Sequence, residues 1–110
     1  MKYSDTQRIE KMRETTGKLL AYVEQSGITK EDILDKEPVQ WTITTPLYNI
    51  GEQAYYLSNE FKEAHPDIPW AKISGLRHRL VHNYYETSWE LIAAVVYQVL
   101  PKFYEDICNI

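Results

Sequence analysis

The residues best suited to catalysis lie close together, between positions 75 and 85. Arg77, His78, His82 and Tyr84 occupy this one short segment. An imidazole is the side chain best suited to proton transfer near neutral pH, and a guanidinium can bind phosphate oxygens through two parallel hydrogen bonds. RNA supplies its own nucleophile, the 2′-hydroxyl, so its cleavage requires a base, an acid and a cation but no metal ion. These residue types therefore match metal-independent phosphodiester chemistry.

Helical geometry would place these groups along one edge of a core helix. At about 100° per residue, one apolar row is formed by Ile73, Leu76, Leu80 and Tyr84. Arg77 flanks this row, and His82 points about 140° away from Arg77. A site within one chain would need the helix to unwind near Asn83, or a groove that both residues rim. A two-fold dimer would instead bring the segments 75–85 of both chains into one cleft.

The two histidines also allow other interpretations. A helical histidine is usually exposed or bonded to a carboxylate. His78 and His82 have the i, i+4 separation of helical metal ligands, but no glutamate follows as in H-E-x-x-H and no cysteine lies near. Arg79 points away from the apolar row and is either a solvated charge or a phosphate contact. The alternatives are a non-catalytic helical module that docks a protein or binds a nucleotide, and a metal-dependent hydrolase.

Composition restricts the class of protein. The 110 residues carry a net charge of −4, which argues against nucleic-acid binding through a broad basic face and requires any such contact to be local. The lone Cys108 excludes an intrachain disulfide and fits a reducing compartment. No apolar run approaches the roughly 18 residues of a membrane span, and the first residues lack a signal-peptide core. We expect one cytoplasmic domain over residues 1–110, without a membrane segment.

Three helical segments are expected in the first half of the chain. Ser4 and Gln7 form a capping-box pattern that begins a helix ending near residue 24, with Gly27 as its stop. A short helical turn follows over residues 29–34. The second long helix is expected from Pro38 to about residue 65, because apolar residues recur at 43, 47, 50, 54, 57 and 61. Pro46 predicts either a kink or a later helix start.

Two more long helices are expected in the second half. Ile68-Pro69-Trp70 opens the helix that carries residues 75–85, and this helix should end near Glu86. Thr87 and Glu90 form a second capping-box pattern, and Pro101 predicts a kink in the last helix. No segment alternates with a period of two, so no sheet is expected. The predicted fold is all-α: an antiparallel bundle of four main helices plus a short helical turn.

Other polar residues are interpreted more simply. Asp5, Arg8 and Glu52 are expected to be surface or ion-pair residues. A cluster of tyrosines in the second helix is more typical of packing than of a platform for stacking bases; it consists of Tyr48, Tyr55 and Tyr56.

Residues 77–84, Arg-His-Arg-Leu-Val-His-Asn-Tyr, resemble the R-x4-H-x-Y signature of HepT-type toxins, a branch of the HEPN superfamily. His78 takes the position of the polar residue that follows the arginine. The resemblance extends along most of the chain, through segments 5–9, 50–54, 65–70 and 100–101. Thr87-Ser88 departs from the family, whose members often have an aspartate there.

The resemblance implies an all-helical dimer that acts as a metal-independent endoribonuclease toxin, with no cofactor and with tRNA or mRNA among the substrates to consider. Its partner would be a minimal nucleotidyltransferase antitoxin, with which the dimer can assemble further. In that family the motif tyrosine accepts nucleotidyl groups that silence the toxin, and the corresponding residue is Tyr84. We expect Arg77 to stabilise charge on phosphate and His82 to act as base or acid. His78 and Arg79 would support these residues or bind substrate.

Overall fold

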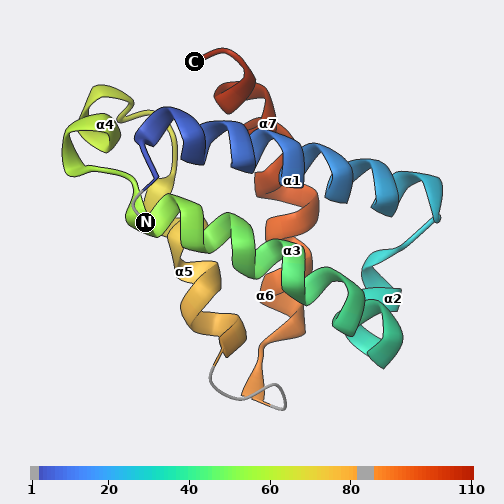
Figure 1. The fold of residues 1–110 in the computed structure, drawn as a ribbon. Helices are drawn as coiled ribbons and strands as arrows, with labels where there is room; N and C mark the ends of the chain where they lie inside the picture. The colour runs from blue at the N-terminus through green and yellow to red at the C-terminus, as the bar shows by residue number, and fades with distance from the viewer. Residues whose placement is uncertain (1–2, 82–85) are drawn as a thin grey trace.

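The computed structural model describes residues 3–81 and 86–110 (Figure 1). Helix α1 spans Asp5–Gln25. As predicted, Ser4 and Gln7 form a reciprocal capping box: the Ser4 hydroxyl accepts the Gln7 N–H, and the Gln7 side chain accepts the Ser4 N–H. Past the other end of α1, Gly27 adopts φ +64°, a left-handed conformation that glycine adopts without steric cost.

Two further helices follow in the first half. Thr29 and Asp32 form a capping box at the start of α2 (Lys30–Asp35), which was predicted as a helical turn. Helix α3 spans Glu37–Tyr56 and has Pro38 in its first turn, as expected. It continues through Pro46, so the alternative in which the helix begins at that proline is wrong.

The predicted continuation of this helix to residue 65 is also wrong. Helix α3 ends at Tyr56, and a separate helix, α4, spans Asn59–Ala64. Ser58 explains the break, because its hydroxyl caps α4 by accepting the Phe61 N–H. The helical spacing of apolar residues continues across the break because Leu57 is buried, even though its backbone is extended and not helical. Hydrophobic spacing alone could not detect this capping serine.

Helix α5 spans Trp70–Val81 and therefore carries the first part of the segment 75–85. Its predicted apolar stripe is confirmed for Ile73, Leu76 and Leu80, which are all buried. Trp70 anchors the start of the helix, since its indole N–H donates to the carbonyl of His65 and its ring meets Phe103 edge-on. The predicted end near residue 86 involves residues 82–85, which lie outside the described part of the chain.

The last predicted helix contains two changes. Ser88, not Thr87, caps α6 (Trp89–Ala94), while the Thr87 hydroxyl donates to the carbonyl of Arg79. A π-helical turn, η2 (Val95–Val99), then connects α6 to α7 (Leu100–Cys108). Where a kink was expected at Pro101, the chain has this turn: Leu100 donates to the carbonyl of Val95, just before the residue that has no N–H.

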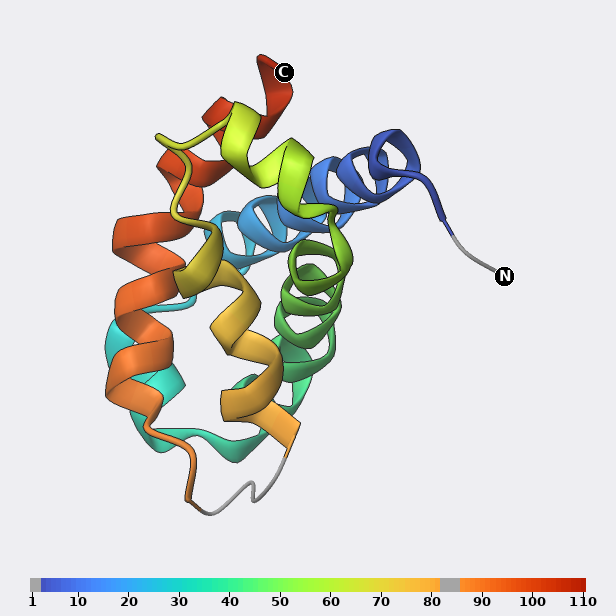
Figure 2. The ribbon, with the colours of Figure 1, turned by 90° about the vertical axis from the view of Figure 1, so that its left-hand side faces the viewer.

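The helices enclose one core, and α3 makes its most extensive contact with α5 (Figures 1 and 2). Helices α1 and α3 run in opposite directions, as do α5 and the α6–α7 segment. Helix α3 contacts both α1 and α5, and α1 also contacts α7. The prediction of an all-α bundle is confirmed, with no strand among the described residues. Nor is any described helix both long and apolar enough to span a bilayer.

Helices α3 and α5 approach most closely at Gly51. A Cβ atom on Gly51 would lie 2.7 Å from the backbone nitrogen of Arg77 and 3.1 Å from the carbonyl oxygen of Ile73. Both are backbone atoms, so neither can move aside as a flexible side chain would. Glycine is therefore required for the observed separation of the two helices, and this separation determines where Arg77 lies relative to α3.

We predict that Gly51→Ala lowers the free energy of unfolding by about 1–3 kcal/mol, because the methyl group forces α5 away from α3. Gly75→Ala is the matched control: it lies in the partner helix, and an added Cβ meets nothing within 4 Å. That change should be neutral or stabilising by up to about 1 kcal/mol, because alanine favours helix. Urea unfolding followed by circular dichroism measures both. Equal effects of the two substitutions would contradict the proposed steric constraint.

Candidate functional site

Arg77 lies on the side of α5 that faces α3, and its side chain is 31% exposed. Its Nε donates to Oε1 of Glu52 at 2.5 Å, an ion pair between the two helices. This bond uses the Nε hydrogen and involves neither Nη group. The predicted position of Arg77 on the flank of the apolar stripe is confirmed: its neighbour Leu76 is fully buried.

Two tyrosines of α3 surround the same guanidinium. The Arg77 Cζ atom lies 4.2 Å from the centre of the Tyr55 ring and 5.6 Å from that of Tyr56. The two rings meet edge-on at 5.0 Å, and each residue is 50% exposed. A cation over an aromatic face is attracted by the electron density of the ring. The interpretation of Tyr55 and Tyr56 as packing residues is therefore wrong, because both form an exposed surface around a cation.

Glu52 connects the arginine to a third tyrosine. The Tyr48 hydroxyl donates to the same Oε1 atom at 3.0 Å. Hydrogen bonds from Arg77 and then Tyr48 lower the pKa of Glu52, while the bond to Glu52 raises the pKa of Tyr48. The same ion pair raises the pKa of Arg77. Glu52 was expected to be a surface or ion-pair residue; it is an ion-pair residue, and its partner is the predicted catalytic arginine.

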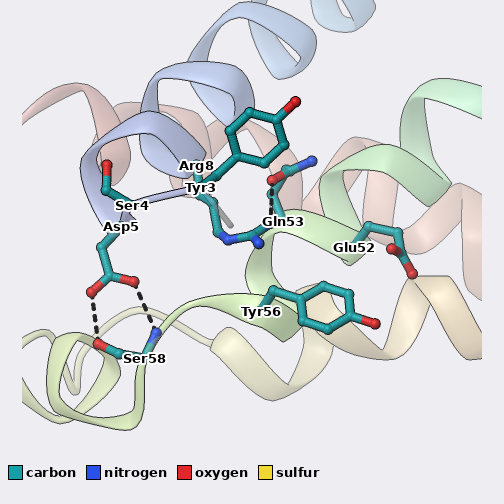
Figure 3. A pocket seen from close by; sticks show the side chains of 8 residues that line it. All are labelled: Tyr3, Ser4, Asp5, Arg8, Glu52, Gln53, Tyr56 and Ser58. Carbon is teal, nitrogen blue, oxygen red and sulfur yellow. Dashed lines mark hydrogen bonds between the residues drawn. The ribbon is translucent and has the colours of Figure 1, made fainter. Parts of the chain in front are cut away.

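A second guanidinium lies beside this cluster, in a hollow of about 850 Å³ (Figure 3). Arg8 of α1 lies between two tyrosine rings, 5.2 Å from the centre of Tyr56 and 5.6 Å from that of Tyr3. Its Nη1 donates to the side-chain oxygen of Gln53 at 2.9 Å. Glu52 and Tyr56 also line this hollow, so it adjoins the Arg77 cluster directly.

The far wall of the hollow is held by Asp5 and Ser58. The Ser58 backbone N–H and hydroxyl donate to the two carboxylate oxygens of Asp5 at 2.9 and 2.7 Å. These bonds, the hydroxyl first, lower the pKa of Asp5, with a smaller contribution from the charge of Arg8. They also attach the beginning of α1 to the α3–α4 junction, which positions Arg8 next to Tyr56.

Two of the other predicted site residues, His78 and Arg79, lie on the described helix α5. His78 and Arg79 are exposed, and Arg79 borders a different hollow together with Lys72 and Leu91. His82 and Tyr84 lie outside the described residues, so the structure does not test their placement. Within the described part of the chain, no three histidine, cysteine, aspartate or glutamate side chains converge as a metal site would require.

The sequence interpretation missed the tyrosine–carboxylate face that α3 presents to Arg77. Tyr48, Glu52, Tyr55 and Tyr56 follow an i, i+4, i+7, i+8 pattern, which is one helical face. A single carboxylate among three tyrosines on one helical face was a signal available in the sequence. It could not identify Arg77 as the partner, because that contact depends on how α5 packs.

A family model for HepT-like ribonucleases matches residues 6–110. The similar proteins include a candidate RNase of Methanocaldococcus jannaschii, 28% identical over 73% of this chain and 73% of its own length. A candidate RNase of Caldanaerobacter subterraneus subsp. tengcongensis is 29% identical over 76% of this chain and 75% of its own. A probable ribonuclease HepT of Thermococcus cleftensis is 31% identical over 66% of each chain. No solved structure matches significantly.

We predict that Glu52→Gln weakens the pH dependence of stability on the acid side. Above the pKa of a glutamate in an unfolded chain, about 4.3, Glu52 is ionised in both the folded and the unfolded state, and the ion pair stabilises the fold fully. Below that pH the unfolded chain binds a proton that the folded chain still excludes, so the free energy of unfolding falls until the lowered folded-state pKa is passed. Urea unfolding between about pH 7 and 3 should show a smaller loss for the variant.

The matched control introduces the same substitution into an Arg77→Gln background. Because Arg77 is the largest cause of the lowered pKa, Glu52→Gln should then change the pH profile much less. An equal change in both backgrounds would mean that the ion pair does not stabilise the ionised carboxylate.

Proposed function

The chain belongs to the HepT-like ribonuclease family, and from this membership we propose that it is an endoribonuclease whose site is built around Arg77. One observation carries the proposal. The family's motif arginine is a partly exposed guanidinium, oriented by Glu52 and bordered by tyrosine rings, at the edge of an open hollow. Such a group can bind a phosphodiester and stabilise the charge that develops on it.

The proposed reaction needs only groups of the protein and the substrate. The RNA 2′-hydroxyl attacks the adjacent phosphorus and forms the new O–P bond, while the bond from phosphorus to the 5′-oxygen of the next nucleotide breaks. The attacking 2′-hydroxyl gives its proton to a general base, and the departing 5′-oxygen receives a proton from a general acid; His82 acts as one of the two. Arg77 binds the phosphate oxygens through its Nη edge and stabilises the pentavalent transition state.

Glu52 has a positioning role in this proposal. A flexible arginine loses side-chain entropy when it binds phosphate, and an ion pair at Nε fixes it beforehand. The carboxylate reduces the net positive charge of the site, so substrate affinity must come from several contacts rather than from Arg77 alone. His78 and Arg79, both exposed on α5, are proposed to support the site or to contact substrate at its edge.

A two-fold dimer is part of the proposal. On one regular helix, Arg77 and His82 would point about 140° apart, and two copies of the stretch around a shared cleft overcome this divergence. The cleft would then hold the arginine of each chain and the histidine of each chain. We further propose cytoplasmic RNA, either tRNA or mRNA, as the substrate.

The proposed biological role is that of a toxin paired with a minimal nucleotidyltransferase antitoxin. Transfer of nucleotidyl groups to Tyr84 would place bulk and negative charge near the phosphate-binding arginine. That charge would compete directly with the substrate phosphate for Arg77. The modification would therefore silence cleavage without unfolding the protein.

A second function is favoured by the charge of the molecule. The chain carries −4 overall, and Glu52 already pairs with Arg77. Both features suit a non-catalytic module that docks the nucleotidyltransferase or binds a nucleotide better than they suit a nuclease. That function predicts a tight complex with the partner and no RNA cleavage under any condition.

We predict that Arg77→Ala and His82→Ala each reduce RNA cleavage by about 10²- to 10⁴-fold, because one removes charge stabilisation and the other a proton-transfer group. Cleavage of a labelled RNA in the presence of chelator measures the loss, and circular dichroism checks that the helices remain. Lys30→Ala, an exposed cation on α2, is the control and should cleave at the parental rate. Parental rates from both site variants would disprove the assignment.

A mixture of the two inactive variants tests the shared cleft. In a heterodimer, one chain supplies the intact arginine and the other the intact histidine, so a composite cleft should regain part of the activity after subunit exchange. Failure to regain activity, despite proven exchange, would argue against a composite site.

We predict that co-expression with a minimal nucleotidyltransferase adds nucleotide mass to Tyr84 and abolishes cleavage. Tyr84→Phe should remain unmodified because it lacks the accepting hydroxyl. Tyr85→Phe is the matched control at the adjacent position and should be modified like the parent. Intact-mass and peptide mass spectrometry decide the result, and modification of both variants to the same extent would exclude Tyr84 as the acceptor.

A further inference from the structure

The exposed surface that joins the beginning of α1 to α3 and α5 alternates cations with aromatic rings. Each cationic atom lies between 4.2 and 5.6 Å from the centre of the ring beside it. Taken in spatial order, this cation–tyrosine track consists of Lys11, Tyr3, Arg8, Tyr56, Arg77 and Tyr55. Arg77, the proposed phosphate-binding arginine, is therefore next to last in the track. A second arginine, Arg8, is separated from it by the ring of Tyr56.

We propose that the track is a binding path for single-stranded RNA, with a second nucleotide subsite in the hollow around Arg8. This inference rests on the proposal that the chain acts on RNA, and it names the form of RNA and the residues that bind it away from the cleavage point. Alternating aromatic faces and cations are what a single strand requires, because its bases stack on the rings and its phosphates contact the charges.

The rings of the track are available for stacking. Tyr3 is 45% exposed, and Tyr55 and Tyr56 are 50% exposed. The hollow of about 850 Å³ beside them lies within the usual range for small-ligand sites, about 300–1,000 Å³. Tyrosines that served only the core would bury their rings, as the fully buried Phe103 does.

The polar groups of the hollow suit a nucleotide. Arg8 donates to a neutral amide oxygen, that of Gln53, so this bond does not cancel its charge. In Figure 3 the amide nitrogen of Gln53 points away from Arg8, where it can donate to the edge of a base. Both carboxylate oxygens of Asp5 accept hydrogen bonds from Ser58. The charge of Asp5 therefore faces the far wall of the hollow.

Single-stranded RNA fits better than a duplex. In a duplex the base faces are stacked on one another and cannot reach exposed tyrosine rings, whereas unpaired nucleotides can. The net charge of −4 also argues against the broad basic surface that duplex binding uses. A short local track of three cations therefore selects a flexible strand that can follow it.

Binding can be tested separately from cleavage with 2′-O-methyl RNA, which lacks the proposed nucleophile. We expect Tyr3→Ala to weaken the binding of an unstructured oligonucleotide of about 12 nucleotides by roughly tenfold, the loss of one stacking contact. Tyr22→Ala is the matched control, because Tyr22 lies toward the other end of α1 with a similar exposure of 41%. It should bind like the parent. Fluorescence anisotropy provides the dissociation constants.

A salt titration tests the role of Arg8. If Arg8 contacts a phosphate, Arg8→Gln should reduce the slope of log K against log salt by about 0.7, the value for one phosphate on a single strand. Lys18→Gln, an exposed cation further along α1, should leave the slope unchanged. Thermal unfolding of each variant separates a lost contact from a lost fold.

The outcomes separate this inference from the proposed function. Parental affinity and slope in both Tyr3→Ala and Arg8→Gln would overturn the track, even if the parent cleaves RNA and Arg77→Ala does not. Weaker RNA binding by both variants, without cleavage by the parent, would support the track and overturn the nuclease proposal. If the two variants lose affinity for a nucleotidyltransferase but not for RNA, the surface binds protein and the track is overturned.

Discussion

The contact between α3 and α5 at Gly51 is the constraint on which the rest of the molecule depends. Helices whose backbones approach this closely cannot accommodate a side chain between them, and here the backbone nitrogen of Arg77 faces the missing Cβ. Buried residues on both helices, among them Ile50 and Leu76, stabilise the contact by roughly 1.5–3 kcal/mol each. The same approach brings Glu52, one residue after the glycine, to the guanidinium of Arg77. Core packing and site geometry are therefore determined at one point.

An arginine that is paired with a carboxylate, as Arg77 is with Glu52, has two opposing consequences for phosphate binding. Glu52 weakens the electrostatic attraction for a phosphate, but it also holds the guanidinium so that its Nη edge is directed in advance. The tyrosine rings add attraction without adding charge, because a cation is stabilised over an aromatic face. An acidic protein can in this way present a local phosphate-binding surface. The same features connect the Arg77 cluster to Arg8 through Tyr56, which contacts both guanidinium groups.

Local signals in the sequence predicted most of the helices, and they failed where two signals competed. Ser4, Thr29 and Gly27 marked helix ends correctly, because capping depends on neighbouring backbone groups alone. The apolar spacing through Leu57 concealed the break before α4, since a buried leucine satisfies the same spacing in an extended backbone. Adjacent Thr87 and Ser88 offered two caps of the same chemistry; in the structure Ser88 caps α6, while the Thr87 hydroxyl donates to the carbonyl of Arg79.

For the candidate site, the sequence by itself determined which residue types were present and placed Arg77 beside the buried stripe, because helical periodicity is a property of the local chain. It also predicted that Glu52 would be a surface or ion-pair residue. Only the tertiary structure decided that its partner is Arg77, that Tyr55 and Tyr56 surround that arginine, and that Arg8 of α1 lies beside them. Those contacts join residues from helices far apart in sequence. Their distances depend on how closely the helices pack, and no local pattern of residues encodes that separation.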